Sequence, residues 1–178
     1  MLSPSMIVAS LRTAGIEMVD FDWSAVTLPA SAAWMLFACS HEDGREDAVF
    51  VFDDPALVES ANAAWWTLAK TGGLLTGVSE FLVSVGPVDA EIPARPHWAR
   101  VRLMKDWNVI GAGTDHGVLG GPPGRPGFVM MSLDERVIVG ATTGDGFISV
   151  VRVSDPAGAA PIRRAMGPGE RPGHVPDV

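Results

Sequence analysis

The stretch that decides the fold is residues 48–73, AVFVFDDPALVESANAAWWTLAKTGG, in which an apolar run is followed by a helix with recognisable ends. Asp54 and Pro55 predict the helix start, because an Asp side chain accepts hydrogen bonds from the free N–H groups of the first turn and Pro lacks an N–H that would be unpaired there. Gly72 predicts the end, because glycine adopts the left-handed conformation that closes a helix. The stretch therefore predicts a buried strand followed by a helix over 55–70.

The helix predicted over 55–70 has one apolar face and one large residue outside it. The apolar side chains that recur at helical spacing are Leu57, Ala61, Ala64, Trp65 and Leu68. This spacing predicts a face packed on a sheet. Trp66 falls on the opposite side, beside Glu59 and Asn62. Two explanations stay open for its ring: a loop or the tail covers it, or it anchors a contact with another chain, in which Glu59 and Asn62 take part.

Shorter patterns on either side of this unit predict the fold class. A helix start at Pro4 and a later glycine delimit a first helix over about 4–14. The segment 33–40 is apolar on both faces, which predicts a central strand. Three apolar runs joined by tight turns within 128–153 predict an antiparallel meander. We therefore expect an α+β domain with a mostly antiparallel sheet of about seven to nine short strands and two helices, over about 4–14 and 55–70.

The end of the chain differs in composition from the rest. Residues 154–178 contain five prolines and four glycines and few apolar side chains. Such a segment buries too little apolar surface to offset its ordering entropy. We expect residues 1–153 to form a single globular domain and residues 154–178 to form a disordered tail.

The charge balance argues against nucleic-acid binding. The chain has 13 basic and 21 acidic residues and a net charge of -8, whereas phosphate contacts need clustered cations. The charges are also unevenly distributed, with three basic and thirteen acidic residues before residue 95 and ten basic and eight acidic residues after it. Either the two halves neutralise each other by interleaving in one fold, or an acidic face remains for a basic partner.

No membrane or export signal is evident. No apolar run approaches the roughly 20 residues that a membrane span requires. The first residues, MLSPSMIVASLRTAG, lack the pattern of a signal peptide. The single cysteine, Cys39, excludes an internal disulfide, so we expect a cytoplasmic protein.

A small group of residues could bind or process an anion. Arg100 and Arg102 should share one face of a strand, and two guanidinium groups suit a carboxylate or phosphate. They could equally pair with the acidic half of the same chain. His97 next to them, and Asp115 with His116 in the glycine-rich loop 111–127, are weak candidates for acid and base catalysis.

The residue spacings do not match known cofactor-binding or metal-binding motifs. Residues 109–117, VIGAGTDHG, begin like a dinucleotide-binding turn, but the glycine spacing differs and the following VLGGPPGRPG cannot form the required helix. The histidines lack a metal-ligand spacing and Cys39 has no second cysteine, so we expect neither a metal site nor a cofactor.

Two functions from different classes follow. The first is a small acidic cytoplasmic interaction protein that binds, inhibits or neutralises a protein partner, or assembles with itself, without catalysis. The alternative is a small enzyme or ligand-binding protein with an anionic small-molecule pocket between the sheet and the loop 111–127, held by Arg100 and Arg102. No family pattern distinguishes them, because the chemistry of a pocket can come from residues scattered along the chain.

Overall fold

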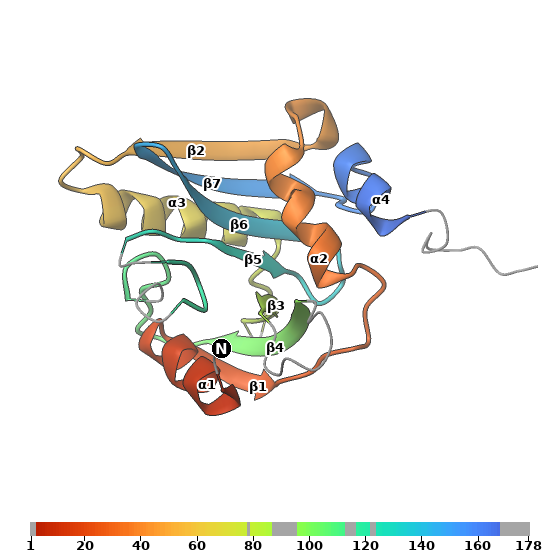
Figure 1. Cartoon of the computed structure of the whole chain (residues 1–178), viewed down its shortest axis with the longest axis horizontal. Coiled ribbons are helices and arrows are strands. Elements are labelled where there is room, and N and C mark those ends of the chain that lie inside the picture. The colour runs from red at the N-terminus through yellow and green to blue at the C-terminus, as the bar shows by residue number, and fades with distance from the viewer. Residues whose placement is uncertain (1–2, 78, 87–95, 113–116, 122–123, 168–178) are drawn as a thin grey trace, which may run out of the picture.

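The protein is an α+β fold built on one antiparallel sheet, as the sequence predicts (Figure 1). A computed structural model describes residues 3–77, 79–86, 96–112, 117–121 and 124–167. Within these residues the sheet has seven strands in the order β1-β4-β3-β5-β6-β7-β2. The strands β1 and β2, which are neighbours along the chain, therefore form the two opposite edges of the sheet.

The elements follow one another along the chain with these bounds, η marking a 3-10 helix: α1 (Pro4–Thr13), β1 (Ile16–Asp20), α2 (Ala30–Ala33), η1 (Trp34–Ala38), η2 (His41–Asp43), β2 (Arg45–Val51), α3 (Leu57–Gly72), β3 (Glu80–Val85), β4 (His97–Leu103), β5 (Phe128–Met131), β6 (Val137–Gly144), β7 (Phe147–Ser154) and α4 (Ala160–Met166). The predicted meander is confirmed as β5, β6 and β7, which pair in sequence order.

The sheet is covered on both faces, so its strands carry apolar residues on both sides. One core lies between the sheet and the helices α1 and α3, and includes Leu11, Trp65 and Phe128. The other lies on the opposite face under α2, η1 and α4, and includes Leu36 and Ile162. Figure 1 shows α3 behind the sheet and α2 with α4 in front of it. The result is three layers, helices, sheet and helices.

Helix α3 confirms the predicted helix but begins two residues later than expected, whereas the strand before it, β2, is a partly exposed edge strand and not the buried strand predicted. The Asp54 carboxylate accepts a hydrogen bond from the N–H of Ala56 (2.8 Å), and the N–H of Leu57 donates to the Asp54 carbonyl (3.1 Å). Asp54 therefore forms the turn before the helix rather than its cap. At the other end, Gly72 is the last helical residue, and Gly73 takes the left-handed conformation with φ 85°.

The strand predicted over 33–40 is wrong, because this segment is helical. It forms the end of α2 and the 3-10 helix η1. An apolar run without clear periodicity fits a buried helix as well as a buried strand. Gly140 of β6 makes room for η1 on the sheet: a Cβ there would lie 3.0 Å from the Phe37 ring and 3.2 Å from Leu36.

The C-terminal segment expected to be a tail contributes one more helix. Residues 160–166 form α4, in which Ile162 is fully buried and Met166 is 7% exposed against the second core. Residues 168–178 lie outside the described residues. The packed part of the chain thus extends past residue 153.

None of the helices in the described part of the chain has the length and apolar character that crossing a bilayer requires.

Candidate functional site

The two arginines expected to hold an anion are bound to an internal carboxylate. Arg100 and Arg102 lie on one face of β4, as predicted, and both contact Glu80 of β3, which is 5% exposed. Arg100 donates to Glu80 Oε2 from Nε (2.9 Å) and Nη2 (2.5 Å), and Arg102 donates to Oε1 from Nε (3.2 Å) and Nη2 (2.6 Å). Arg102 also reaches Glu17 of β1 at 3.4 Å. A small anion at this place would have to displace Glu80.

Glu80 itself was not identified from the sequence. Hydrogen bonds from Arg102 and Arg100 hold the pKa of its carboxyl below the usual range, so it is ionised at neutral pH. The sequence feature that could have identified Glu80 is its place as the first residue of the otherwise uncharged strand EFLVSV, which is followed by a strand with two arginines at alternate positions. Strand pairing then brings Glu80 opposite Arg102.

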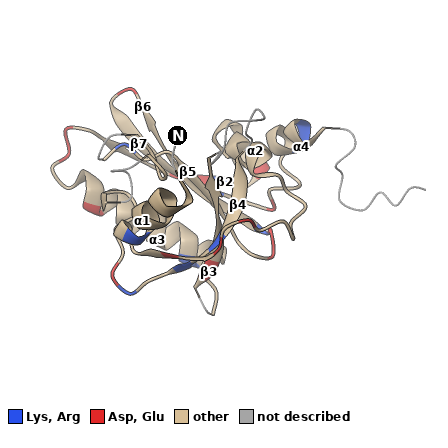
Figure 2. Cartoon of the chain, turned by 60° about the horizontal axis from the view of Figure 1, so that its bottom comes forward, with Lys and Arg blue, Asp and Glu red and all other residues tan. Residues whose placement is uncertain are grey.

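The uneven charge distribution is partly cancelled inside the sheet. Three acidic side chains from the first half of the chain pair with basic ones from the second half in four ion pairs: Glu17 with Arg102, Glu80 with both arginines of β4, and Glu46 of β2 with Arg152 of β7. Figure 2 shows acidic and basic positions interspersed over the fold. Interleaving therefore accounts for part of the asymmetry, and an acidic face can arise only where such pairs are missing.

The surface around Trp66 is half covered by the segment that follows β4. The Trp66 ring stacks on Trp107, with centroids 5.2 Å apart and 22° between the planes, and Lys70 Nζ lies 5.0 Å from the Trp66 ring centroid. Asn62 fixes the same segment, because its Nδ2 donates to Asn108 (2.7 Å) and its Oδ1 accepts from the N–H of Ile110 (3.0 Å). A loop thus covers one side of Trp66. Its use as a contact anchor, beside the exposed Glu59, stays a prediction.

The acid and base candidates are not brought together in the described residues. His97 is partly exposed and its ring lies 5.3 Å from that of Phe21 in a tilted contact. Asp115 and His116 lie outside the described residues. Within the part of the chain that the structure describes, no three His, Cys, Asp or Glu side chains are placed to hold a metal ion.

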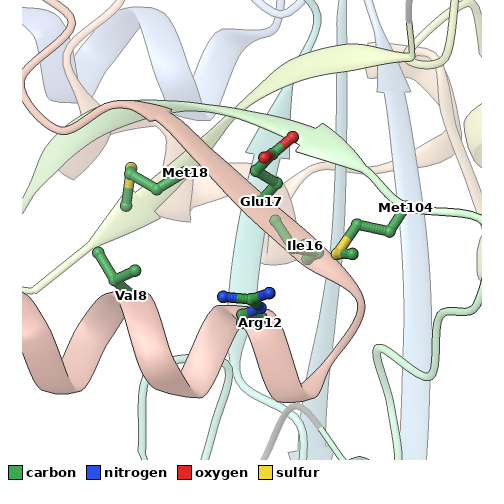
Figure 3. Close-up of a pocket in the computed structure, with 6 residues that line it drawn as sticks. All are labelled: Val8, Arg12, Ile16, Glu17, Met18 and Met104. Atoms are coloured by element: carbon green, nitrogen blue, oxygen red, sulfur yellow. The ribbon is translucent and has the colours of Figure 1, made fainter.

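A pocket of about 240 Å³ lies between α1 and β1 (Figure 3). The residues lining it are Val8 and Arg12 of α1, Ile16, Glu17 and Met18 of β1, and Met104. Arg12 makes no ion pair with any described residue, and Figure 3 shows the Glu17 carboxylate pointing away from it. The pocket is therefore lined largely by apolar side chains, with the guanidinium of Arg12 among them and the Glu17 carboxylate paired with Arg102.

The edge strand β2 offers unpaired backbone groups. It pairs only with β7, and the N–H of Phe52 donates to the Gly146 carbonyl (3.0 Å) just beyond the ladder. Residues facing each other in an antiparallel pair alternate between bonding to the partner and pointing away from it. The even-numbered residues of β2 therefore bond to β7, and the odd-numbered ones turn their N–H and C=O groups outward.

Most of these outward groups have no partner among the described residues. Those of Arg45 are taken by the Ser40 carbonyl and by His41 Nδ1, and the Val51 carbonyl accepts from Asp54. The outward groups left without a partner in the described part of the chain are the N–H and C=O of Asp47, the N–H and C=O of Val49, and the N–H of Val51. We call these three residues the β2 edge. Val49 and Val51 are 56% and 55% exposed, and in Figure 1 no strand lies beyond β2.

Comparison with known proteins provides no guide to the function. No family model matches the chain, and no curated protein sequence and no solved structure matches it significantly. The function has to be inferred from the surfaces just described.

Proposed function

We propose that this chain is a non-catalytic interaction domain that binds an extended segment of a protein partner by adding it as a strand to the β2 edge. The observation that carries the proposal is the row of outward backbone groups at Asp47, Val49 and Val51, next to two exposed valine side chains. Unpaired strand edges are templates for pairing with another chain, and strand addition combines main-chain hydrogen bonds with side-chain contacts.

The composition of β2 supports this use of its edge. Proteins that keep an edge strand free usually protect it with charged side chains, especially Lys, with Pro or with a β-bulge. The strand REDAVFV contains neither Pro nor Lys, and its register with β7 runs without a shift from Arg45 to Val51. Its last four residues, AVFV, carry no charge. A partner strand can therefore approach without displacing any element.

A non-catalytic role is supported by how the ionisable groups are engaged. Arg100 and Arg102 are occupied by Glu80, and the Glu17 carboxylate at the α1–β1 pocket is paired with Arg102. We place the domain in the cytoplasm, which the buried, unpaired Cys39 supports.

The proposal is tested by selecting binders from a random peptide library and measuring them against Val49→Pro. Proline removes the outward N–H of residue 49 but no bond to β7, and edge strands tolerate it in this position. We expect the selected peptides to bind the wild-type chain and Val49→Thr, which keeps the N–H and the branched shape, and to lose affinity at least about tenfold for Val49→Pro.

Circular dichroism shows whether Val49→Pro is folded, and amide exchange locates the bound peptide. We expect the amides of Asp47, Val49 and Val51 to become protected on binding. Peptides that bind Val49→Pro as well as wild type, and protect amides elsewhere, would refute strand addition at this edge.

A second candidate function, binding of a small anion, is favoured by Arg12 in the α1–β1 pocket. An aliphatic carboxylate could place its chain against Val8 and Met18 and its head at Arg12. Calorimetric titration with hexanoate should then give binding that Arg12→Gln weakens. The absence of heat with the wild-type chain would eliminate this candidate.

A further inference from the structure

We infer that the strand added at the β2 edge is a basic segment of another protein and not a second copy of this chain. This inference rests on the proposed strand addition and concerns the chemistry of the occupant. It follows from the charges that surround the exposed valines.

The segment that contains the β2 edge is strongly acidic. Residues 41–54, HEDGREDAVFVFDD, contain six carboxylates and one basic residue, Arg45. Arg45 is engaged internally, since its Nη1 donates to the carbonyls of Phe37 (3.0 Å) and Cys39 (3.1 Å) and its Nη2 lies 3.3 Å from Asp47. Arg45 therefore compensates one of the six carboxylates, Asp47, and the segment keeps an acidic excess.

The charges that other elements bring to this region leave carboxylates at both ends of β2. Arg152 neutralises Glu46, and Arg125 lies over the ring of Phe52, which packs against the core on the α3 side. Glu42 before the strand and Asp53 after it are exposed and form no ion pair with any described residue. An occupant of the edge thus meets negative charge at its two ends and apolar surface in the middle.

The geometry of strand pairing predicts which side chains the partner strand should carry opposite these residues. Residues directly opposite in adjacent strands point to the same face with Cβ atoms about 4.5–5.5 Å apart. Residues opposite Val49 and Val51 should be apolar, preferably β-branched, and the residue opposite Asp47 should be Lys or Arg. Asp53 lies in the turn after the strand, where a further basic residue can approach it without strand pairing, so the pattern is basic, any, apolar, any, apolar, any, basic.

A second copy of the chain does not match this pattern. Two edge strands related by a two-fold axis pair antiparallel, each offering the same residues to the other. With Phe50 on the axis, Asp47 would face Asp53 of the copy, and with Val49 on the axis it would face Val51, so neither register places a cation opposite Asp47. Opposite charges that face each other across strands are stabilising, so a strand with a cation opposite Asp47 pairs more favourably with the edge than a second copy does.

The test uses two fluorescein-labelled peptides that differ only in charge, Lys-Thr-Val-Thr-Val-Thr-Lys-Lys and Glu-Thr-Val-Thr-Val-Thr-Glu-Glu. Lysines at both ends match the acidic ends of β2 in either strand direction. We expect fluorescence anisotropy to show the lysine peptide binding about tenfold tighter than the glutamate peptide at about 50 mM NaCl, with the preference falling to about twofold at about 500 mM because salt screens exposed charges.

Two variants separate the charge effect from strand addition. The double variant Asp47→Asn with Asp53→Asn should still bind the lysine peptide but lose most of the preference for it. Val49→Pro should lose both peptides, while Val49→Thr keeps both. If wild type binds the two peptides with equal affinity and Val49→Pro binds neither, the inference that the partner is basic is overturned, whereas strand addition at the β2 edge is supported.

Two other outcomes would also decide the matter. Peptide binding that survives Val49→Pro, or failure of both peptides to bind at millimolar concentration, would overturn the inference together with the proposed function. If sedimentation velocity shows a dimer that Val49→Pro converts to a monomer, the occupant of the β2 edge is a second copy of the chain and the inference of a basic partner is overturned.

Discussion

The two adjacent tryptophans of α3 allow a sharp test of how this helix lies on the sheet. Trp65 is fully buried in the core between α3 and the sheet, whereas Trp66 is half buried and stacks on Trp107. Adjacent helical residues differ by about 100° in direction, so Trp65 points into the core while Trp66 packs only at its margin. Replacing each in turn by Ala should therefore have clearly different costs.

The expected magnitudes follow from these surroundings. Truncating a buried Trp to Ala costs about 3–5 kcal/mol, because apolar burial is lost and a cavity remains. Trp66→Ala loses a stacked aromatic contact, worth about 0.5–1.5 kcal/mol, and the contact with Lys70, worth about 0.5–1 kcal/mol at an exposed site. Since 1 kcal/mol shifts Tm by about 2–4 °C in a chain of this length, Trp65→Ala should lower Tm by about 6–20 °C and Trp66→Ala by about 2–10 °C.

Thermal unfolding followed by circular dichroism, with urea unfolding to obtain free energies, measures both costs. The neighbouring variant Thr67→Ala serves as the control, because Thr67 is exposed and its hydroxyl bonds only to the Ala63 carbonyl within the same helix. It should change the free energy of unfolding by no more than about 0.5 kcal/mol. If Trp66→Ala destabilises the protein as much as Trp65→Ala, the helix is rotated from the position described and our reasoning about its outer face is wrong.

Three further predictions concern the sheet and its buried groups. The arginine partners of Glu80 lower the pKa of its carboxyl in the folded state, so the carboxylate stabilises the fold fully above the ordinary Glu pKa of about 4.3 and loses this effect as pH falls through the folded pKa. Glu80→Gln should therefore be less stable than wild type near neutral pH, and the difference in unfolding free energy should close in acid. Urea unfolding at several pH values measures this difference, and a difference that persists at the most acidic pH contradicts the prediction. Gly140→Ala should lower the free energy of unfolding by about 1–3 kcal/mol, because the added Cβ would lie 2.7 Å from the backbone oxygen of Phe128. Gly86→Ala is the matched control and should be nearly neutral, because its Cβ would meet nothing within 4 Å. Burial raises the pKa of the Cys39 thiol, so a thiol reagent at neutral pH should modify Cys39 slowly in the folded chain and rapidly in urea, and rapid labelling of folded protein would place the thiol at the surface.

The parts of the fold that could be predicted are those with a clear period and clear ends. Helix α3 has a core stripe, a proline near its start and glycines at its end, and the structure confirms it within two residues at each end. The meander β5 to β7 alternates between strands and tight turns, and it too is confirmed. In both cases local signals suffice, because the turn chemistry and the hydrophobic pattern agree.

The parts that could not be predicted depend on contacts between distant segments. The segment 33–40 is helical, and η1 fits on the sheet because Gly140, more than a hundred residues later, leaves space for it. The pairing of Arg100 and Arg102 with Glu80 was left open as an internal alternative, and which carboxylate they meet depends on the order of the strands. The β2 edge follows from the same order, because nothing in REDAVFV says whether a neighbour lies on one side or on two.

The pairing of β2 with β7 also has a consequence for how the chain is made. The two strands are about one hundred residues apart, so at a synthesis rate of about 5–20 residues per second β2 leaves the ribosome about 5–20 s before its only partner. During that interval Val49, Phe50 and Val51 are exposed with both edges of the strand free. A nascent chain that stalls before β7 should therefore be a favoured client of chaperones that recognise extended apolar segments.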